Sequence, residues 1–257
     1  MNTPINTPTG PPTSTPTGTL LVPYYEHPSV RPAEWAAILA AAPRLYAVVL
    51  NPASGPGDRP DAAFAQTAAR LRTAGVTLLG YADTGYGARP YEDVEDELRR
   101  YRAWYGTHGA FLDQAASGAG EARHYERLTT AARSLGCVTL VLNHGTRPHP
   151  AYAPLADLQV TFEGPWSAYL RTPARPGPRP AGARVCHLVY GVPPDADAAG
   201  AARARGAAVH CAVPGTGAHP WGTLPHGLGP RVPPARSPGT GTGTGIGTEP
   251  SGRAPAR

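Results

Sequence analysis

Apolar residues recur along the chain in eight short runs, and amphipathic segments separate most of them. The runs span residues 20–22, 45–50, 76–81, 109–112, 138–142, 158–162, 184–190 and 207–213. They are rich in Val and Leu, which is typical of parallel strands that are covered on both faces. Each run therefore predicts a buried strand.

The segments between the runs carry apolar residues at helical spacing. Residues 91–105 are the clearest case, because Val94, Leu98, Tyr101 and Tyr105 form one stripe and the first turn is acidic, which suits the helix dipole. Similar stripes predict helices over 32–42, 61–74 and 124–135. Two short helices are expected near 154–156 and 166–171, and a seventh helix over 195–205. Strands alternating with helices in eight units predict an α/β fold, a single (β/α)8 TIM barrel. A doubly wound open sheet is the alternative, but no glycine-rich phosphate turn follows the first run.

Both ends of the 257-residue chain differ in composition from the middle. Residues 1–18 are mostly Thr, Pro, Asn and Gly, and residues 227–257 are mostly Gly, Pro, Thr and Arg. Neither composition buries enough apolar surface to offset the entropy of ordering. We therefore expect a disordered Thr/Pro-rich tail over 1–18, the barrel domain over 19–226, and a second disordered tail over 227–257.

The charge pattern bears on possible partners. The net charge is +5, and all 23 basic residues are arginine. The arginines are scattered and do not interleave with aromatic residues, so we expect no nucleic-acid partner. No run is long enough to span a bilayer, and the N-terminus lacks the charged and apolar regions of a signal peptide. The sequence as written thus predicts no membrane partner and a cytoplasmic location, or a secreted one if the start site is misassigned, and it leaves the oligomeric state open.

Cysteines and histidines give little sign of a metal. Cys137, Cys186 and Cys211 lie in apolar runs without a CxxC pair, which predicts buried thiols. His187 and His210 fall within predicted strands, but no HxH pair accompanies them. A metal-dependent barrel hydrolase is therefore disfavoured, and we predict no metal and no cofactor.

The residues that close the strands are the candidates for chemistry, because the active site of a TIM barrel lies at the carboxyl ends of its strands. Asp113 directly follows the fourth run, and Glu163 follows the sixth. Alternation along 158–163 predicts that Gln159, Thr161 and Glu163 face the barrel axis and that Leu158, Val160 and Phe162 face the helices. Carboxylates supply the acid, base or nucleophile for glycosidic cleavage, so Asp113 and Glu163 are the predicted catalytic pair. An aspartate that caps the next loop and a solvated loop glutamate are the alternatives.

Amide and aromatic side chains at the same rim could hydrogen-bond or stack on a sugar. The predicted substrate-binding residues are Tyr24, Tyr25, Asn51, Tyr81, Gln114, Asn143 and Trp221. Turn formation is the alternative for Asn51 and Asn143, since each precedes a turn. Further rim residues are the acids Glu26 and Asp83, together with Tyr190. Three histidines are candidate bases that are better explained as rim or loop residues: His144, His149 and His187.

Several of these residues also carry a family resemblance. The segments LVPYY (21–25), VLNPASGPG (49–57), GYADTGYG (80–87), GAFLD (109–113), VLNHGT (141–146) and VTFE (160–163) resemble, in order, the spherulin-4 family, also called spherulation-specific family 4. The likeness covers nearly all of 20–226. It implies a (β/α)8 barrel. Characterised relatives imply a glycoside hydrolase that cuts α-1,4-linked galactosamine or N-acetylgalactosamine polymers of microbial exopolysaccharide.

The resemblance also implies a site, an Asp-Glu pair that ends the fourth strand and a Glu that ends the sixth. Asp113 and Glu163 match two of these acids, but Gln114 stands where the second is typical, and an amide cannot ionise. His144 likewise stands where a proline is usual.

Two functions follow from this comparison. One is endo-acting hydrolysis, with Glu163 as general acid/base and Asp113 as nucleophile or as stabiliser of the N-acetyl group. The other is a catalytically impaired carbohydrate-binding or developmental protein on the same barrel.

Overall fold

The computed structural model describes residues 18–174 and 184–229, so most of both predicted tails lies outside the described residues. Eight parallel strands pair in sequence order, and the first closes against the last. The strands are β1 (Leu20–Pro23), β2 (Leu45–Leu50), β3 (Leu78–Asp83), β4 (Gly109–Asp113), β5 (Thr139–Asn143), β6 (Leu158–Pro165), β7 (Arg184–Tyr190) and β8 (Val209–Ala212). The predicted barrel is thus confirmed, and the open sheet is excluded.

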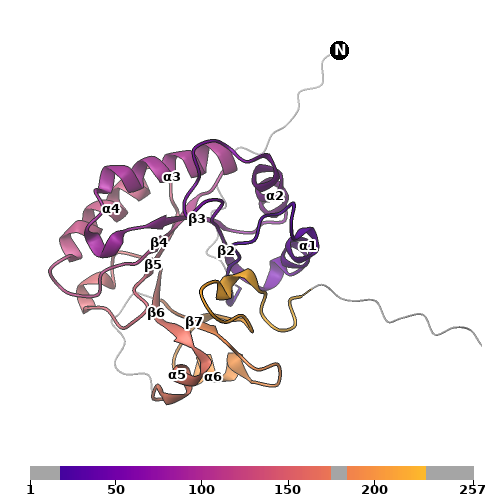
Figure 1. Ribbon diagram of the computed structural model, residues 1–257. Coiled ribbons are helices and arrows are strands. Elements are labelled where there is room, and N and C mark those ends of the chain that lie inside the picture. Colours follow the sequence, from indigo (N-terminus) through magenta and orange to yellow (C-terminus); the bar gives the residue numbers. More distant parts are fainter. Residues whose placement is uncertain (1–17, 175–183, 230–257) are drawn as a thin grey trace, which may run out of the picture.

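Helices surround the ring of strands. They are α1 (Pro32–Ala40), α2 (Ala62–Thr73), α3 (Tyr91–Tyr105), α4 (Ala122–Ser134), α5 (Trp166–Arg171) and α6 (Ala198–Ala204), with 3-10 turns η1 (Ala42–Arg44), η2 (Gly85–Gly87), η3 (Pro150–Tyr152) and η4 (Pro220–Gly222). Figure 1 shows that the long helices α1 to α4 arch over one side of the ring and that the short helices α5 and α6 cover the other. The helix predicted near 154–156 is wrong. A 3-10 turn forms just before it, and Pro154 lacks the N–H that would continue that turn as a helix.

Local contacts explain how α2 and α3 are placed beside the site-bearing strands. The Asp61 carboxylate accepts a 2.8 Å hydrogen bond from the N–H of Phe64, which caps the start of α2. Gly80 lets α3 approach β3, since a Cβ at this position would lie 2.5 Å from the ring of Tyr101. The chain leaves α3 at Gly106, whose φ of 65° is a conformation that glycine adopts freely.

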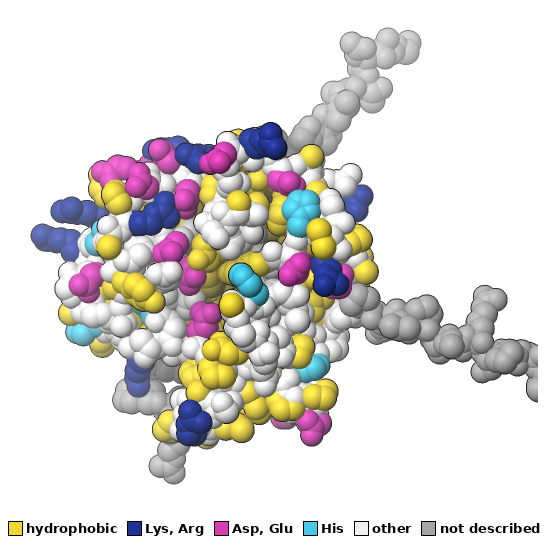
Figure 2. All heavy atoms as spheres, viewed as in Figure 1, with side chains coloured by type: hydrophobic (Ala, Val, Ile, Leu, Met, Phe, Trp, Pro, Cys, Tyr) yellow, Lys and Arg dark blue, Asp and Glu magenta, His cyan; other side chains and the backbone are white. Residues whose placement is uncertain are grey.

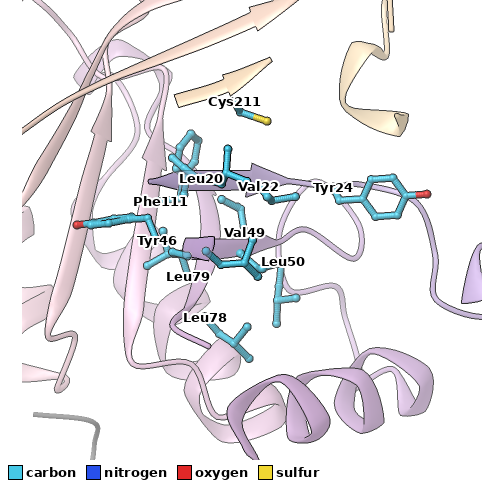
Figure 3. Close-up of a cluster of buried hydrophobic side chains, with 14 of the residues drawn as sticks. Leu20, Val22, Tyr24, Tyr46, Val49, Leu50, Leu78, Leu79, Phe111 and Cys211 are labelled. Atoms are coloured by element: carbon cyan, nitrogen blue, oxygen red, sulfur yellow. The ribbon is translucent and has the colours of Figure 1, made fainter. Parts of the chain in front are cut away.

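Side chains fill the inside of the barrel. Tyr81 of β3 stacks on Phe111 of β4, with ring centroids 6.3 Å apart. Arg184 of β7 places its guanidinium 5.0 Å from the centroid of the Tyr46 ring on β2. These two strands lie on different sides of the barrel, so both side chains reach into its interior. Tyr46 and Phe111 belong to one cluster of buried side chains, and both are drawn in Figure 3. The three thiols are buried and free, as predicted.

A β-bulge in β6 overturns part of the predicted alternation. Leu158 pairs with Arg184 and Val160 pairs with Cys186, but the register shifts between Val160 and Phe162. Since Arg184 points into the barrel, Leu158 and Val160 also face inward. The prediction that these two residues face the helices is therefore wrong.

The same bulge restores the expected orientation at the top of the strand. Beyond it, the ring of Phe162 packs on Tyr169 of α5, with centroids 4.7 Å apart. Glu163, the next residue, turns inward. An extra residue in one strand reverses the parity of everything after it. A strict period of two cannot detect such an insertion.

Three further observations complete the description of the fold. No helix among the described residues is both long and apolar enough to cross a bilayer. On the face shown in Figure 2, arginine side chains are dispersed among acidic and uncharged ones. The packed chain also continues past residue 226, because the side chain of Leu228 is buried against the core.

Candidate active site

Three polar side chains meet at the carboxyl ends of β4, β5 and β6. The amide nitrogen of Asn143 donates to Asp113 Oδ1 at 2.7 Å and to Glu163 Oε2 at 2.5 Å. Asn143 is buried, and its side-chain oxygen Oδ1 accepts a hydrogen bond from the N–H of Gly145 at 3.1 Å. One amide group therefore bridges the two carboxylates that the sequence singles out.

Aromatic residues complete the cluster. The Tyr81 hydroxyl donates to Asp113 Oδ2 at 2.8 Å, and Trp221 Nε1 donates to Glu163 Oε1 at 3.2 Å. Tyr25 meets the ring of Tyr81 edge-on, with centroids 5.8 Å apart. Each of the four carboxylate oxygens thus has a side-chain donor, and Tyr25, Tyr81 and Trp221 all lie where the rim prediction expects them.

The environment raises the pKa of both carboxyl groups. Burial is the main cause at Asp113, while the hydrogen bonds from Tyr81 and Asn143 oppose it. Burial also raises the pKa of Glu163, and the neighbouring charge of Asp113 adds to this effect. Burial and the Asp113 charge raise the pKa of Tyr81, which keeps its hydroxyl protonated as a donor. A raised pKa favours the protonated form of a carboxyl, and a general acid must be protonated in order to donate.

Gln114 lies beside a third acid, Asp83, at the end of β3. Its amide nitrogen donates to Asp83 Oδ2 at 2.9 Å, and Asp83 pairs in register with Asp113. The second Asp83 oxygen accepts from the N–H of Gly85 at 2.7 Å. Gln114 adopts a left-handed φ of 49°. The Gln114 side chain, which was predicted to contact substrate, is thus hydrogen-bonded to the neighbouring carboxylate of Asp83.

Two predicted contact residues lie elsewhere. Tyr24 is buried, and its ring packs edge-on against Trp35 of α1 at 5.4 Å, because consecutive residues of an extended chain point to opposite sides. Figure 3 shows Tyr24 extending away from Phe111 and Tyr46. Asn51 uses its side-chain oxygen to accept from the N–H of Gly55 at 2.8 Å, so it stabilises a turn. The structure does not bring Tyr24 to the carboxylate cluster, and it ties Asn51 into the loop.

The candidate histidines have structural partners. His144 is buried with Nδ1 2.8 Å from the carbonyl oxygen of Ala116, and burial lowers its pKa to about 4. His187 lies outside the barrel, with Nδ1 2.7 Å from the Tyr169 hydroxyl. His149 accepts from the N–H of Ala151 at the start of η3. Within residues 18–174 and 184–229, no group of three or more His, Cys, Asp or Glu side chains could hold a metal ion.

Thr84 was not identified from the sequence, and it hydrogen-bonds to the backbone at the end of β4. Its buried hydroxyl lies 2.8 Å from the carbonyl oxygen of Asp113 and 2.9 Å from that of Gln114. The N–H of Thr84 also donates to the Asp113 carbonyl at 3.0 Å. A threonine directly after a strand gives no distinctive signal, since this position is usually exposed.

Comparison with known proteins identifies the family and agrees with the barrel fold. A family model described as spherulation-specific family 4 matches residues 19–213. Spherulin-4 of Physarum polycephalum is 36% identical over 149 residues, which cover 56% of this chain and 44% of that protein. This chain therefore aligns with less than half the length of that relative. Sph3 of Aspergillus clavatus, solved in complex with GalNAc, superposes with a TM-score of 0.69 at 23% identity, over 82% of this chain and 94% of that chain.

Proposed function

This chain belongs to spherulation-specific family 4, and on that premise we propose that it is a glycoside hydrolase acting on a polysaccharide that contains galactosamine or N-acetylgalactosamine. The observation that carries the proposal is the bridge from the Asn143 amide to Asp113 and Glu163. Two carboxyl groups flanking one bond are the usual machinery of glycoside hydrolysis. The GalNAc bound to Sph3 supports an amino sugar as the substrate.

The spacing of the two carboxylates favours a retaining course. Asp113 Oδ1 and Glu163 Oε2 both bond to one nitrogen, at 2.7 and 2.5 Å, so their separation cannot exceed those two distances together. Retaining enzymes keep their carboxyls roughly 5 to 5.5 Å apart, whereas inverting ones need roughly 6.5 to 9.5 Å to admit a water. The bound applies to the nearest pair of oxygens and not to the whole carboxyl groups, and it supports the first class.

The chemistry assigns different roles to the two acids. Asp113 accepts hydrogen bonds from Tyr81, Asn143 and the N–H of Gln114, which stabilise its charged form, so in this proposal Glu163 is the group that carries the proton. Glu163 gives this proton to the glycosidic oxygen as the bond from that oxygen to the anomeric carbon breaks. Asp113 either bonds to the anomeric carbon or stabilises the N-acetyl group that does so. In the second half, Glu163 takes a proton from water as the water oxygen bonds to the anomeric carbon, and the bond from that carbon to Asp113 or to the N-acetyl oxygen breaks, which releases the sugar.

Gln114 favours a second candidate, a carbohydrate-binding or developmental protein with impaired catalysis. The side chain cannot ionise, and it is committed to Asp83. If this amide is what limits the site, Gln114→Glu should increase product release.

Incubation with galactosamine and N-acetylgalactosamine oligosaccharides separates the two candidates. Binding is followed by calorimetry and products by mass spectrometry, with an N-acetylglucosamine oligosaccharide of equal length as the control sugar. Cleavage of the galactosamine series supports the hydrolase. Binding without products favours the second candidate, and neither binding nor cleavage contradicts both.

A further inference from the structure

A strained aromatic residue lies in the turn that follows β3. Tyr86, the middle residue of η2, has φ 55° and ψ 32°, between Gly85 at φ 54° and Gly87 at φ 87°. The left-handed region is unfavourable for a residue with a Cβ, and glycine or asparagine occupies it more easily. The chain therefore keeps a tyrosine at a position whose backbone disfavours it.

Packing does not explain this tyrosine. Its side chain is 62% exposed, and no hydrogen bond, ion pair or ring contact of that side chain occurs within the described residues. The ring thus gains little from burial that would offset the backbone strain. An observed backbone outlier without a structural benefit points to function.

Backbone hydrogen bonds tie this turn to the end of β4. The N–H of Tyr86 donates to the carbonyl oxygen of Gln114 at 2.8 Å, one residue beyond Asp113. Arg89 braces the turn, because it donates to the carbonyl oxygen of Asp83 at 2.7 Å and forms an ion pair with Glu97 at 2.8 Å. Tyr86 is therefore held at the same mouth as the carboxylate pair, on the β3 side.

We propose that Tyr86 is a stacking platform for one sugar ring of the polysaccharide, at a subsite beyond the two carboxylates. This inference rests on the proposed function. An exposed aromatic face packs on the C–H face of a pyranose, and a rigid turn supplies that face at little entropic cost. A long oligosaccharide reaches the subsite, whereas a short one bound at Asp113 and Glu163 does not.

The test compares affinities in the Glu163→Gln chain, which leaves the probe uncut. Tyr86→Asn removes the ring and tolerates the left-handed backbone. We expect it to weaken binding of a long N-acetylgalactosamine oligosaccharide by about three- to tenfold, to leave a short one unchanged, and not to lower Tm. Tyr86→Phe should retain the affinity because it keeps the ring. Val138→Asn is the control, since Val138 is 44% exposed just before β5, at the opposite end of the strands.

The outcomes distinguish this inference from the proposed function. If the unaltered chain cleaves the polymer while Tyr86→Asn binds the long oligosaccharide as tightly as its parent, the subsite is refuted and the hydrolase stands. A fall in Tm for Tyr86→Asn with unchanged affinity would instead make Tyr86 a structural residue. If no oligosaccharide binds and none is cleaved, both proposals are overturned.

Discussion

The side-chain amide of Gln114 donates a 2.9 Å hydrogen bond to the carboxylate of Asp83. An amide can donate to a carboxylate, but a second carboxylate in its place cannot do so without a proton. The identity of residue 114 therefore controls the charge balance at the ends of β3 and β4, next to Asp113.

Gln114→Glu should make folding stability depend on pH. The charge of Asp83 raises the pKa of the introduced carboxyl above its value in the unfolded chain. The variant therefore loses no folding stability at pH values below the unfolded pKa. The loss grows as pH rises through the folded pKa, to about 1–2 kcal/mol near neutral pH. Thermal unfolding of both chains from pH 4 to 8 measures the difference. The double variant Asp83→Asn/Gln114→Glu should remove it, and a pH-independent difference would contradict the Asp83 contact.

Asn143→Ala should shift the pH–rate profile upward. Removing the amide takes away a donor that lowers the pKa of both Asp113 and Glu163, so both limbs of the kcat/KM profile move to higher pH. The maximum should also fall by about 10²-fold, because the carboxylates lose their shared anchor. Trp221→Phe is the matched control, since it removes a donor from Glu163 alone and should move only the basic limb. If Asn143→Ala has the same pH dependence of kcat/KM as the unaltered chain, the hydrogen bonds from Asn143 play no part in catalysis.

His144 should make the fold sensitive to acid. Burial lowers its pKa to about 4, so the unfolded chain takes up this proton first as pH falls below 6.5. Stability is then lost between these two values, by about 2–3 kcal/mol. His144→Gln keeps a side chain that can bond the carbonyl of Ala116 but does not titrate, and it should reduce the loss measured by urea unfolding. Some loss remains because His187, whose pKa burial lowers to about 4, titrates in the same window. An equal loss in both chains would exclude His144 as a cause.

The first product released should retain its anomeric configuration. This follows from the short separation between the Asp113 and Glu163 oxygens that share the Asn143 amide. Proton NMR of an oligosaccharide digest, recorded before mutarotation, distinguishes the two outcomes. The inverted anomer as first product would mean that a water occupies the gap during the reaction.

Much of the fold and part of the site follow from local patterns. Runs of Val and Leu and helical stripes predict the barrel, and the rule that parallel strands end at one mouth brings Asp113 and Glu163 together. Side-chain direction was less predictable. The bulge in β6 turns Leu158 and Val160 inward against the expected alternation, yet leaves Glu163 inward as well.

Contacts between distant segments could not be predicted from the sequence. Tyr24 and Tyr25 are adjacent residues of the same type, so the sequence does not distinguish them. In the structure Tyr24 packs against Trp35 of α1, whereas Tyr25 packs against Tyr81. The pairing of Gln114 with Asp83 depends on the register of β3 and β4. The left-handed backbone of Tyr86 is likewise a property of the folded turn.

The carboxylate pair is tested most directly by measuring the release of reducing ends from an N-acetylgalactosamine polymer. The unaltered chain is compared with Glu163→Gln and with Asp113→Asn. Both variants preserve side-chain shape, so circular dichroism and Tm should be close to the parent values. We predict that each lowers sugar release by about 10²- to 10⁴-fold. Release at the parental rate by either variant would contradict the assignment of that carboxylate.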